Sequence, residues 1–324
     1  MIEAARGEEG GDPAGGSDRL GRGPHTADSR DPGPGPKDGG TAVQLFRLVK
    51  FEHSVFAMPF VLAGAFLAAG GVPSAWSLVW IVAAAVGARN FAFALNRLAD
   101  KDFDAKNPRT RDRLAFRCIV EGKGIWVFMA LSLALFLVSA GLLNRLTLWL
   151  SPVVVGIIVF YSYAKRWTWS CHLFLGSVHG CAAAGAWIAV RGDLTAVPLW
   201  LALGATTWVA GFDLIYACLD FDFDRAEGLR SVPARFGVPR ALWLSGGLHF
   251  VTAFSLFMAG WFGQLGAIYW LSWLLGTALL AYEHVVVRPG DFSRVDLSFF
   301  HLNAWFSVIV GMGAVADVLW RSYG

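Results

Sequence analysis

Two clusters of acidic residues stand where apolar segments of the chain end. The first lies within residues 96–104 and the second within residues 220–225. Carboxylates are costly beside hydrocarbon, so acidic residues in such places indicate a functional role. Basic residues follow each cluster: Arg109, Arg111 and Arg113 after the first, and Arg225, Arg230 and Arg235 after the second. A diphosphate substrate requires this combination, because acidic residues bind the metal ion and basic residues bind the anion.

The spacing within each cluster places its members on one face of a helix. Asn96, Asp100 and Asp104 are four residues apart, and so are Asp220 and Asp224. Residues at this spacing are neighbours on a helical surface. Because Mg²⁺ binds carboxylates together with waters and substrate phosphates, two facing stripes predict a site for more than one Mg²⁺ bridged by a diphosphate.

Three further aspartates differ in their expected roles. Asp102 and Asp222 point away from the two stripes on an ideal helix, so we exclude them from the metal site. Asp213 lies seven residues before Asp220, two turns deeper on roughly the same face. An acidic residue inside an apolar segment favours a functional role, and Asp213 could orient an acceptor or a basic partner.

Composition predicts the elements that must position these residues. Of the 324 residues, 56% are hydrophobic and 16% are charged, whereas soluble domains carry about 25% charged residues. The apolar residues run in blocks of roughly 18 to 22, long enough for a helix to cross a bilayer. We therefore expect an all-α multipass membrane bundle. The net charge of +3 gives no argument for a nucleic-acid partner.

The chain divides into a tail and a membrane domain. Residues 1–40 are rich in Gly, Pro, Asp and Arg without apolar periodicity, which predicts a disordered N-terminal extension. Residues 41–324 form the predicted transmembrane domain. Nine spans are expected in it, at residues 54–72, 76–98, 125–143, 147–163, 173–190, 197–219, 242–262, 264–282 and 302–320.

Basic residues are concentrated in alternate loops. The loops after the second, fourth, sixth and eighth spans carry most of them, whereas the opposite loops offer only Arg145 and Arg191. The positive-inside rule then predicts a cytoplasmic N-terminus and an external C-terminus. Both acidic clusters would lie at the cytoplasmic face of a bacterial-type plasma (inner) membrane.

These motifs resemble those of the UbiA superfamily of membrane aromatic prenyltransferases. Its first motif, Asn-x-x-x-Asp-x-x-x-Asp, is matched within residues 96–104, and its second, Asp-x-x-x-Asp followed by Gly and Ser, within residues 220–231. Tyr161, Lys165 and Arg166 resemble the family segment after the fourth span. The family also has nine membrane helices, as we expect here.

The resemblance implies a reaction and its participants. A polyprenyl diphosphate binds with Mg²⁺ between the two motifs, its tail lying along the lipid-facing bundle. Metal and basic side chains stabilise the departing diphosphate, and the allylic cation attacks an electron-rich aromatic ring. The product is a prenylated precursor of ubiquinone or menaquinone.

The resemblance also implies roles for individual residues. The Mg²⁺ ligands are Asp100, Asp104, Asp220 and Asp224, and Asn96 joins them as a ligand of the metal or the diphosphate. The candidate diphosphate contacts are Arg97, Arg109, Lys165, Arg166 and Arg230. The candidates for the acceptor site are Asp213, Tyr161 and Lys50.

The acceptor is left open between two compounds. Residues 49–60 and 211–218 look like the branch of the family that is 4-hydroxybenzoate polyprenyltransferase-like. Some members of that branch are thought to prenylate a dihydroxynaphthoate on a futalosine-type menaquinone route. Both acceptors are hydroxylated aromatic carboxylates, so a basic group such as Lys50 should meet the carboxylate.

Two other classes of membrane protein fit the sequence less well. A transporter would carry charges through several spans or broken spans in mirrored positions, whereas these charges gather at one face. A CDP-alcohol phosphotransferase would need the pattern Asp-x-x-Asp-Gly-x-x-Ala-Arg ahead of its later Asp pair, and the acidic clusters here lack the Asp-Gly and Ala-Arg elements of that pattern.

Overall fold

The structure is a computed structural model that describes residues 54–107, 123–288, 290, 292, 295 and 297–324. The predicted disordered extension at residues 1–40 lies outside the described residues. Nine long helices are described: α2 (Ser54–Ala69), α3 (Ala75–Lys106), α5 (Lys123–Leu143), α6 (Arg145–Trp167), α7 (Cys171–Arg191), α8 (Ala196–Ala217), α11 (Val238–Phe262), α12 (Ala267–Val286) and α13 (Asn303–Tyr323). Four short helical segments complete the description: η3 (Cys218–Asp220), α9 (Phe221–Ala226), α10 (Val232–Phe236) and η4 (Leu297–Leu302).

Each predicted span overlaps one of these long helices. Seven helical stretches in the described part of the chain are long and apolar enough to cross a membrane. The other two long helices are α2, which is a shorter apolar helix, and α12, whose last turns carry Glu283 and His284. The protein is therefore a multipass helical bundle, and nine crossings stay a prediction.

A single residue joins two of the bundle helices, which is shorter than the gap of residues 144–146 between the predicted spans. Asn144 lies between α5 and α6, and its side-chain oxygen accepts a hydrogen bond from the Thr147 N–H at 2.9 Å. This bond satisfies a donor in the first turn of α6, as an N-cap does. The Asn144 amide group also donates to the carbonyl oxygen of Ile188 at 2.7 Å. One side chain thus starts α6 and fastens the hairpin to α7.

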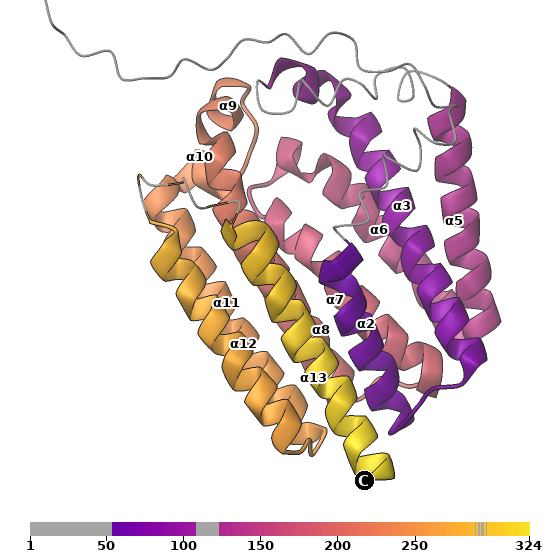
Figure 1. Ribbon diagram of the computed structural model, residues 1–324. Coiled ribbons are helices and arrows are strands. Elements are labelled where there is room, and N and C mark those ends of the chain that lie inside the picture. Colours follow the sequence, from indigo (N-terminus) through magenta and orange to yellow (C-terminus); the bar gives the residue numbers. More distant parts are fainter. Residues whose placement is uncertain (1–53, 108–122, 289, 291, 293–294, 296) are drawn as a thin grey trace, which may run out of the picture. The chain divides into compact units, whose positions relative to one another are not determined.

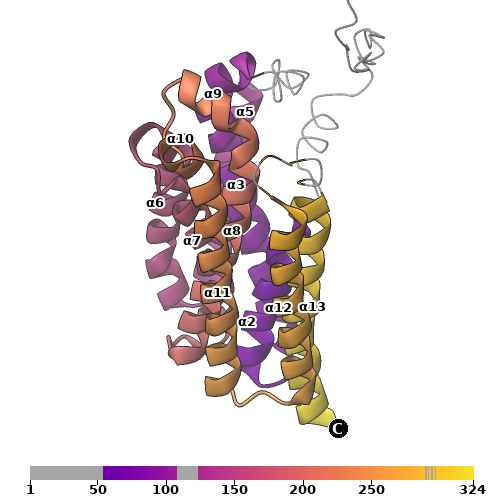
Figure 2. The same cartoon turned by 90° about the vertical axis from the view of Figure 1, so that its left-hand side faces the viewer.

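Six of the helices form a closed ring. In order, α2 contacts α7, α7 contacts α8, α8 contacts α11, α11 contacts α12, α12 contacts α13, and α13 returns to α2 (Figures 1 and 2). The other three long helices pack beside this ring, with α6 against α7 and with α3 and α5 against α6. The helix α8 is the most buried of the apolar stretches, so residues at its end are held from several sides.

Aromatic side chains fill the interior of the ring. The Trp208 ring of α8 is fully buried, and its centroid lies 5.2 Å from that of Phe60 and 5.0 Å from that of Phe306. These distances are typical of favourable aromatic pairs. The Trp208 indole N–H donates to Asn303 Oδ1 at 2.7 Å, which satisfies its polar group inside the bundle.

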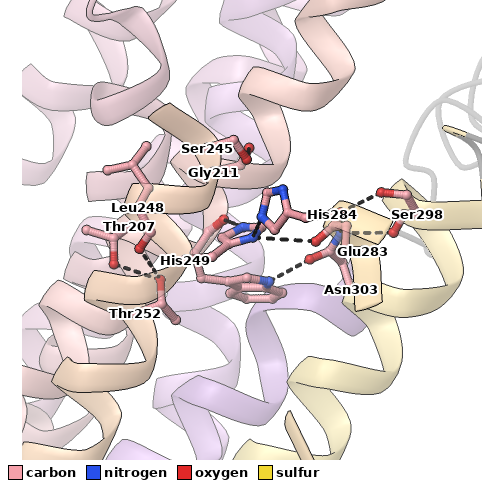
Figure 3. A network of polar contacts seen from close by, with 11 residues as sticks. Thr207, Gly211, Ser245, Leu248, His249, Thr252, Glu283, His284, Ser298 and Asn303 are labelled. Atoms are coloured by element: carbon pink, nitrogen blue, oxygen red, sulfur yellow. Dashed lines mark hydrogen bonds and ion pairs between the residues drawn. The ribbon is translucent and has the colours of Figure 1, made fainter. Parts of the chain in front are cut away.

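A network of polar side chains crosses the interior beside this aromatic cluster (Figure 3). Glu283, which is 1% exposed, accepts hydrogen bonds from Ser298 Oγ at 2.5 Å and from Asn303 Nδ2 at 2.9 Å. His249 Nδ1 lies 3.7 Å from Glu283 Oε2 and 2.9 Å from His284 Nε2. The network ties α11, α12 and α13 together. In the described part of the chain, no lysine or arginine pairs with Glu283.

Candidate functional site

The two acidic clusters lie at the same end of the bundle. The last turns of α3 and the short helix α9 both lie at the top of Figure 1, opposite the C-terminus. Two contacts join them: Asn107 Nδ2 donates to Asp220 Oδ1 at 3.1 Å, and Lys106 pairs with Glu227 at 2.8 Å. The sequence predicts that both clusters lie on one side, and the structure places both at the same end of the bundle, joined by the residues that follow them.

Side chains of the first cluster share one face of α3. Asn96 Nδ2 donates to Asp100 Oδ2 at 3.0 Å, across four residues. The Arg97 guanidinium pairs with Asp104 Oδ2 at 2.8 Å, across seven residues. Asp102 is exposed, whereas Asp100 and Asp104 are partly buried. The assignment of Asp102 to a different face therefore agrees with the structure.

The second cluster corrects one expectation about the backbone. The α-helix of the sixth span does not continue through the aspartates, because it ends at Ala217 and is followed by the 3₁₀ turn η3. A 3₁₀ turn has three residues rather than 3.6 per turn, so it changes the direction in which α9 starts. Asp220 and Asp224 are nevertheless buried, at 8% and 2% exposure, while Asp222 is exposed.

Two adjacent basic residues at the end of α6 reach opposite clusters. Lys165 Nζ lies 3.8 Å from Asp224 Oδ2. Arg166 Nη2 lies 3.8 Å from Asp100 Oδ1 and also donates to the backbone carbonyl of Ala99. The Arg166 guanidinium further lies over the ring of Tyr163, with its carbon 5.0 Å from the ring centroid. The end of α6 thus carries positive charge between the two sets of carboxylates.

The segment after α9 holds the end of α6 in this position. Gly228 adopts a left-handed conformation with φ of 69°, which favours glycine. The chain then turns so that the Arg230 N–H donates to the Lys165 carbonyl oxygen at 2.7 Å. The Arg230 guanidinium donates to the Trp167 carbonyl oxygen at 2.7 Å and is exposed. Arg230 therefore caps α6 and contacts no carboxylate of the two clusters in the contacts described.

Asp213 has a basic partner that sequence reasoning missed. Its Oδ2 lies 2.6 Å from Nδ1 of His172, the second residue of α7. Tyr161 lies within electrostatic reach of both Asp213 and Asp100. A histidine at the start of an apolar segment carries no signal of its own, because only the packing of α7 against α8 places it beside Asp213. The remaining candidates, Lys50 and Arg109, lie outside the described residues.

The residue types at this site suit a divalent cation, but the placement of the described ones does not form a metal site. Among the described residues, no three His, Cys, Asp or Glu side chains are placed to hold a metal ion. Lys165, Arg166 and Arg97 pair with the carboxylates instead. Asp224 Oδ2, however, is buried and accepts no hydrogen bond. Hard carboxylate oxygens with a spare buried acceptor fit Mg²⁺, provided that the basic side chains move toward an anion.

Comparison with known proteins gives a consistent result. The profile of the UbiA prenyltransferase family matches residues 57–306. A 4-hydroxybenzoate octaprenyltransferase of Pseudomonas aeruginosa (strain LESB58) is 29% identical over 279 residues, which cover 86% of this chain and 94% of that protein. The apo structure of a UbiA homologue from Aeropyrum pernix K1 superposes with a TM-score of 0.75 at 34% identity, covering 83% of this chain and 99% of that one.

A second solved structure shares the fold at lower identity. It is a UbiA homologue from Archaeoglobus fulgidus bound to GPP and Mg²⁺, with a TM-score of 0.61 and 19% identity. The match covers 84% of this chain and 99% of that chain.

Proposed function

Because this chain belongs to the UbiA prenyltransferase family, we propose that it transfers a polyprenyl group from polyprenyl diphosphate to an aromatic acceptor of the 4-hydroxybenzoate class in a Mg²⁺-dependent reaction. The observation that carries the proposal is the position of Lys165 and Arg166 between the two carboxylate clusters. A diphosphate placed there would meet cations from α6, and the aspartates would hold Mg²⁺. The names of curated relatives such as the Pseudomonas aeruginosa protein support the acceptor class.

Each group of side chains has a separate task in the proposed reaction. Asp100, Asp104, Asp220 and Asp224 would hold Mg²⁺, with Asn96 as a further oxygen ligand. When bound, Mg²⁺ supplies Lewis acidity that stabilises charge on the departing diphosphate.

The basic side chains bind the same leaving group directly. Lys165 and Arg166 exchange their carboxylate partners for diphosphate oxygens, which form strong charge-assisted hydrogen bonds. Arg97 and Arg109 are the next candidates for such contacts. Since Arg230 is engaged with the end of α6, we assign it the role of holding that end in place rather than a direct contact.

The acceptor and the cellular setting belong to the same proposal. We place the reaction at the cytoplasmic face of a bacterial inner membrane, because the loops on the side of the site carry most of the basic residues. The acceptor ring would approach from the side of Tyr161 and Asp213, with Lys50 as the candidate partner of its carboxylate. The product would serve ubiquinone biosynthesis, or menaquinone biosynthesis if the acceptor is a dihydroxynaphthoate.

A direct assay tests the proposal. Purified protein in detergent would receive a long-chain prenyl diphosphate and Mg²⁺, with 4-hydroxybenzoate and dihydroxynaphthoate offered separately. Mass spectrometry should detect a prenylated 4-hydroxybenzoate. If only dihydroxynaphthoate yields a product, that compound replaces 4-hydroxybenzoate as the proposed acceptor. If neither compound yields a product, the proposed acceptor class is contradicted.

A further inference from the structure

We propose that Asp213 accepts a hydrogen bond from the hydroxyl group of the aromatic acceptor and that His172 is the residue that positions Asp213 for this contact. The inference deepens the proposed function and rests on it. The geometry gives each member of the pair a distinct place. His172 is almost fully enclosed, with 2% exposure, while the Asp213 side chain is 23% exposed.

The contact between the two side chains uses one oxygen of the carboxylate and leaves the other available. His172 Nδ1 and Asp213 Oδ2 are 2.6 Å apart, which is short for a hydrogen bond and typical of pairs involving a charged group. No hydrogen bond to Asp213 Oδ1 is found among the described residues. The second oxygen of a carboxylate has acceptor capacity to spare, so Asp213 can receive a ligand O–H without losing His172.

Asp213 also lies at a suitable depth for an acceptor. It precedes Asp220 by seven residues that run through the end of α8 and the 3₁₀ turn η3, which corresponds to about 12 Å along the helix axis. If the diphosphate lies between the acidic clusters, its reacting carbon points from there toward the bundle interior. The ring that attacks this carbon must come within about 3.5 Å of it. A carboxylate some two turns beneath the diphosphate site can therefore meet a substituent of that ring.

The neighbours of Asp213 connect it to the same space as the acidic and basic residues of the site. Tyr161 interacts electrostatically with Asp213 and with Asp100, and Lys165 interacts with Asp213 as well as with Asp224. Both neighbours belong to α6, the helix whose end carries the cations. Asp213 on α8 therefore lies near the end of α6 that carries the cations.

The packing of α7 against α8 makes His172 a rigid partner. Gly176 lies one turn after His172, and a Cβ at this position would clash with the carbonyl oxygen of Thr206 on α8. This close approach fixes the start of α7 beside Asp213. His172 Nε2 is buried and makes no hydrogen bond, so the ring is directed to Asp213 through Nδ1. A histidine N–H held in this way sets the orientation of a carboxylate.

The hydrogen bond would assist the reaction in two ways. It fixes the ring so that the carbon beside the hydroxyl group faces the allylic carbon. A carboxylate that accepts the hydroxyl hydrogen bond also increases electron donation into the ring as that carbon attacks. A role limited to burying a histidine would produce neither effect, and this difference makes the inference testable.

The experiment measures recognition of the hydroxyl group. The dissociation constants of two ligand pairs would be compared: 4-hydroxybenzoate with benzoate, and dihydroxynaphthoate with naphthoate. We expect wild-type protein to prefer the hydroxylated member and His172→Ala to lose roughly 10- to 100-fold of that preference, the range for a hydrogen bond to a charged group. His172→Asn retains an N–H near the position of Nδ1 and should restore most of it.

Two further measurements separate this role from general damage. The affinity for prenyl diphosphate should stay unchanged in His172→Ala, because that substrate binds at the acidic clusters. Ser177→Ala is the matched control: Ser177 lies in the same helix, and its hydroxyl group donates to the Phe174 carbonyl oxygen of that helix, so the control should keep the wild-type preference.

Each outcome bears on the proposal. Loss of preference in His172→Ala, with recovery in His172→Asn, supports it. An unchanged preference in a folded His172→Ala protein that still binds prenyl diphosphate overturns it. If wild-type protein binds neither hydroxylated compound, the acceptor class fails as well, and this failure is visible before any variant is made.

Discussion

Two carboxylates of this protein are almost equally buried but differ in their partners. Asp224, at the acidic end of the bundle, is 2% exposed and faces the Lys165 ammonium at 3.8 Å. Glu283, in the interior network of Figure 3, is 1% exposed and is held by the Ser298 hydroxyl and the Asn303 amide. The first carboxylate has a cationic partner on a long side chain that can move to an anion. The second is held by short, neutral donors.

This difference separates a site that exchanges partners from one that holds helices together. A buried charge without a partner is strongly unfavourable, so Asp224 needs Lys165 or a metal ion close to it. Glu283 Oε1 accepts two hydrogen bonds that need no substrate, while Oε2 makes no hydrogen bond and lies 3.7 Å from His249 Nδ1. We therefore expect substitutions at the acidic end to remove activity and substitutions in the interior network to remove stability.

The largest expected effect is the loss of transfer in Asp224→Ala. The substitution removes a proposed Mg²⁺ ligand and should lower the turnover rate by at least about 100-fold, the order found when one strong electrostatic contact to a leaving group is lost. Prenyl transfer by detergent-purified protein measures the effect. Asp222→Ala is the matched control, because Asp222 lies in the same short helix but is exposed, and it should keep its activity. Wild-type turnover in Asp224→Ala would refute the assignment.

Removal of the metal ion should also reduce activity without reducing stability, and it needs no mutation. Treatment with a chelator is expected to abolish transfer, and added Mg²⁺ should restore it. The thermal unfolding midpoint should change little, because Lys165, Arg166 and Arg97 lie beside the carboxylates and can compensate their charge when the metal is removed. A protein that remains active with excess chelator would remove Mg²⁺ from the proposed function. A large drop in the midpoint would mean that the metal is structural.

The interior network should respond in the opposite way. Glu283→Ala leaves the donors of Ser298 and Asn303 without their acceptor, and each buried unsatisfied group costs about 1–3 kcal/mol. We expect the unfolding midpoint to fall clearly while the turnover rate per folded molecule is retained. Glu283→Gln keeps one carbonyl oxygen for these donors, so its unfolding midpoint should fall less. If Glu283→Ala keeps the wild-type unfolding midpoint but loses prenyl transfer, Glu283 acts in the reaction. The proposed separation between activity at the acidic end and stability in the interior network would then be wrong.

Much of the fold could be predicted from the sequence because bilayer crossing depends on local composition. Every predicted span overlaps a long helix, and the spacing of four in the first cluster correctly placed Asn96 beside Asp100. The comparisons confirm membership of the prenyltransferase family. These successes rest on features that are repeated along one segment of chain, and they require no knowledge of which helices touch.

The partners of individual side chains could not be predicted because they depend on contacts between helices. Nothing in the local sequence distinguishes Lys165, which reaches Asp224, from Arg166, which reaches Asp100. The pairing of His172 with Asp213 likewise follows from the approach of α7 to α8. Glu283 was placed just beyond a span predicted to end at residue 282, whereas α12 continues to Val286 and buries it. A few residues at a helix end thus decide whether a carboxylate is expected inside the bundle.

The smallest expected effect concerns two contacts at the acidic end, one exposed and charged and the other buried and neutral. Comparing them tests whether burial or charge determines how much a contact contributes to turnover and stability. Lys106 and Asn107 are neighbours at the end of α3, and both contact the segment of chain that carries the second cluster. Lys106 is exposed and pairs with Glu227, whereas Asn107 is buried and donates to Asp220. An exposed ion pair contributes about 0–1 kcal/mol, so Lys106→Ala should barely change turnover or the unfolding midpoint. Asn107→Ala should lower both, because Asp220 loses a buried donor that orients it. Equal effects of the two substitutions would show that the bridge as a whole, and not the buried hydrogen bond, holds the two clusters together.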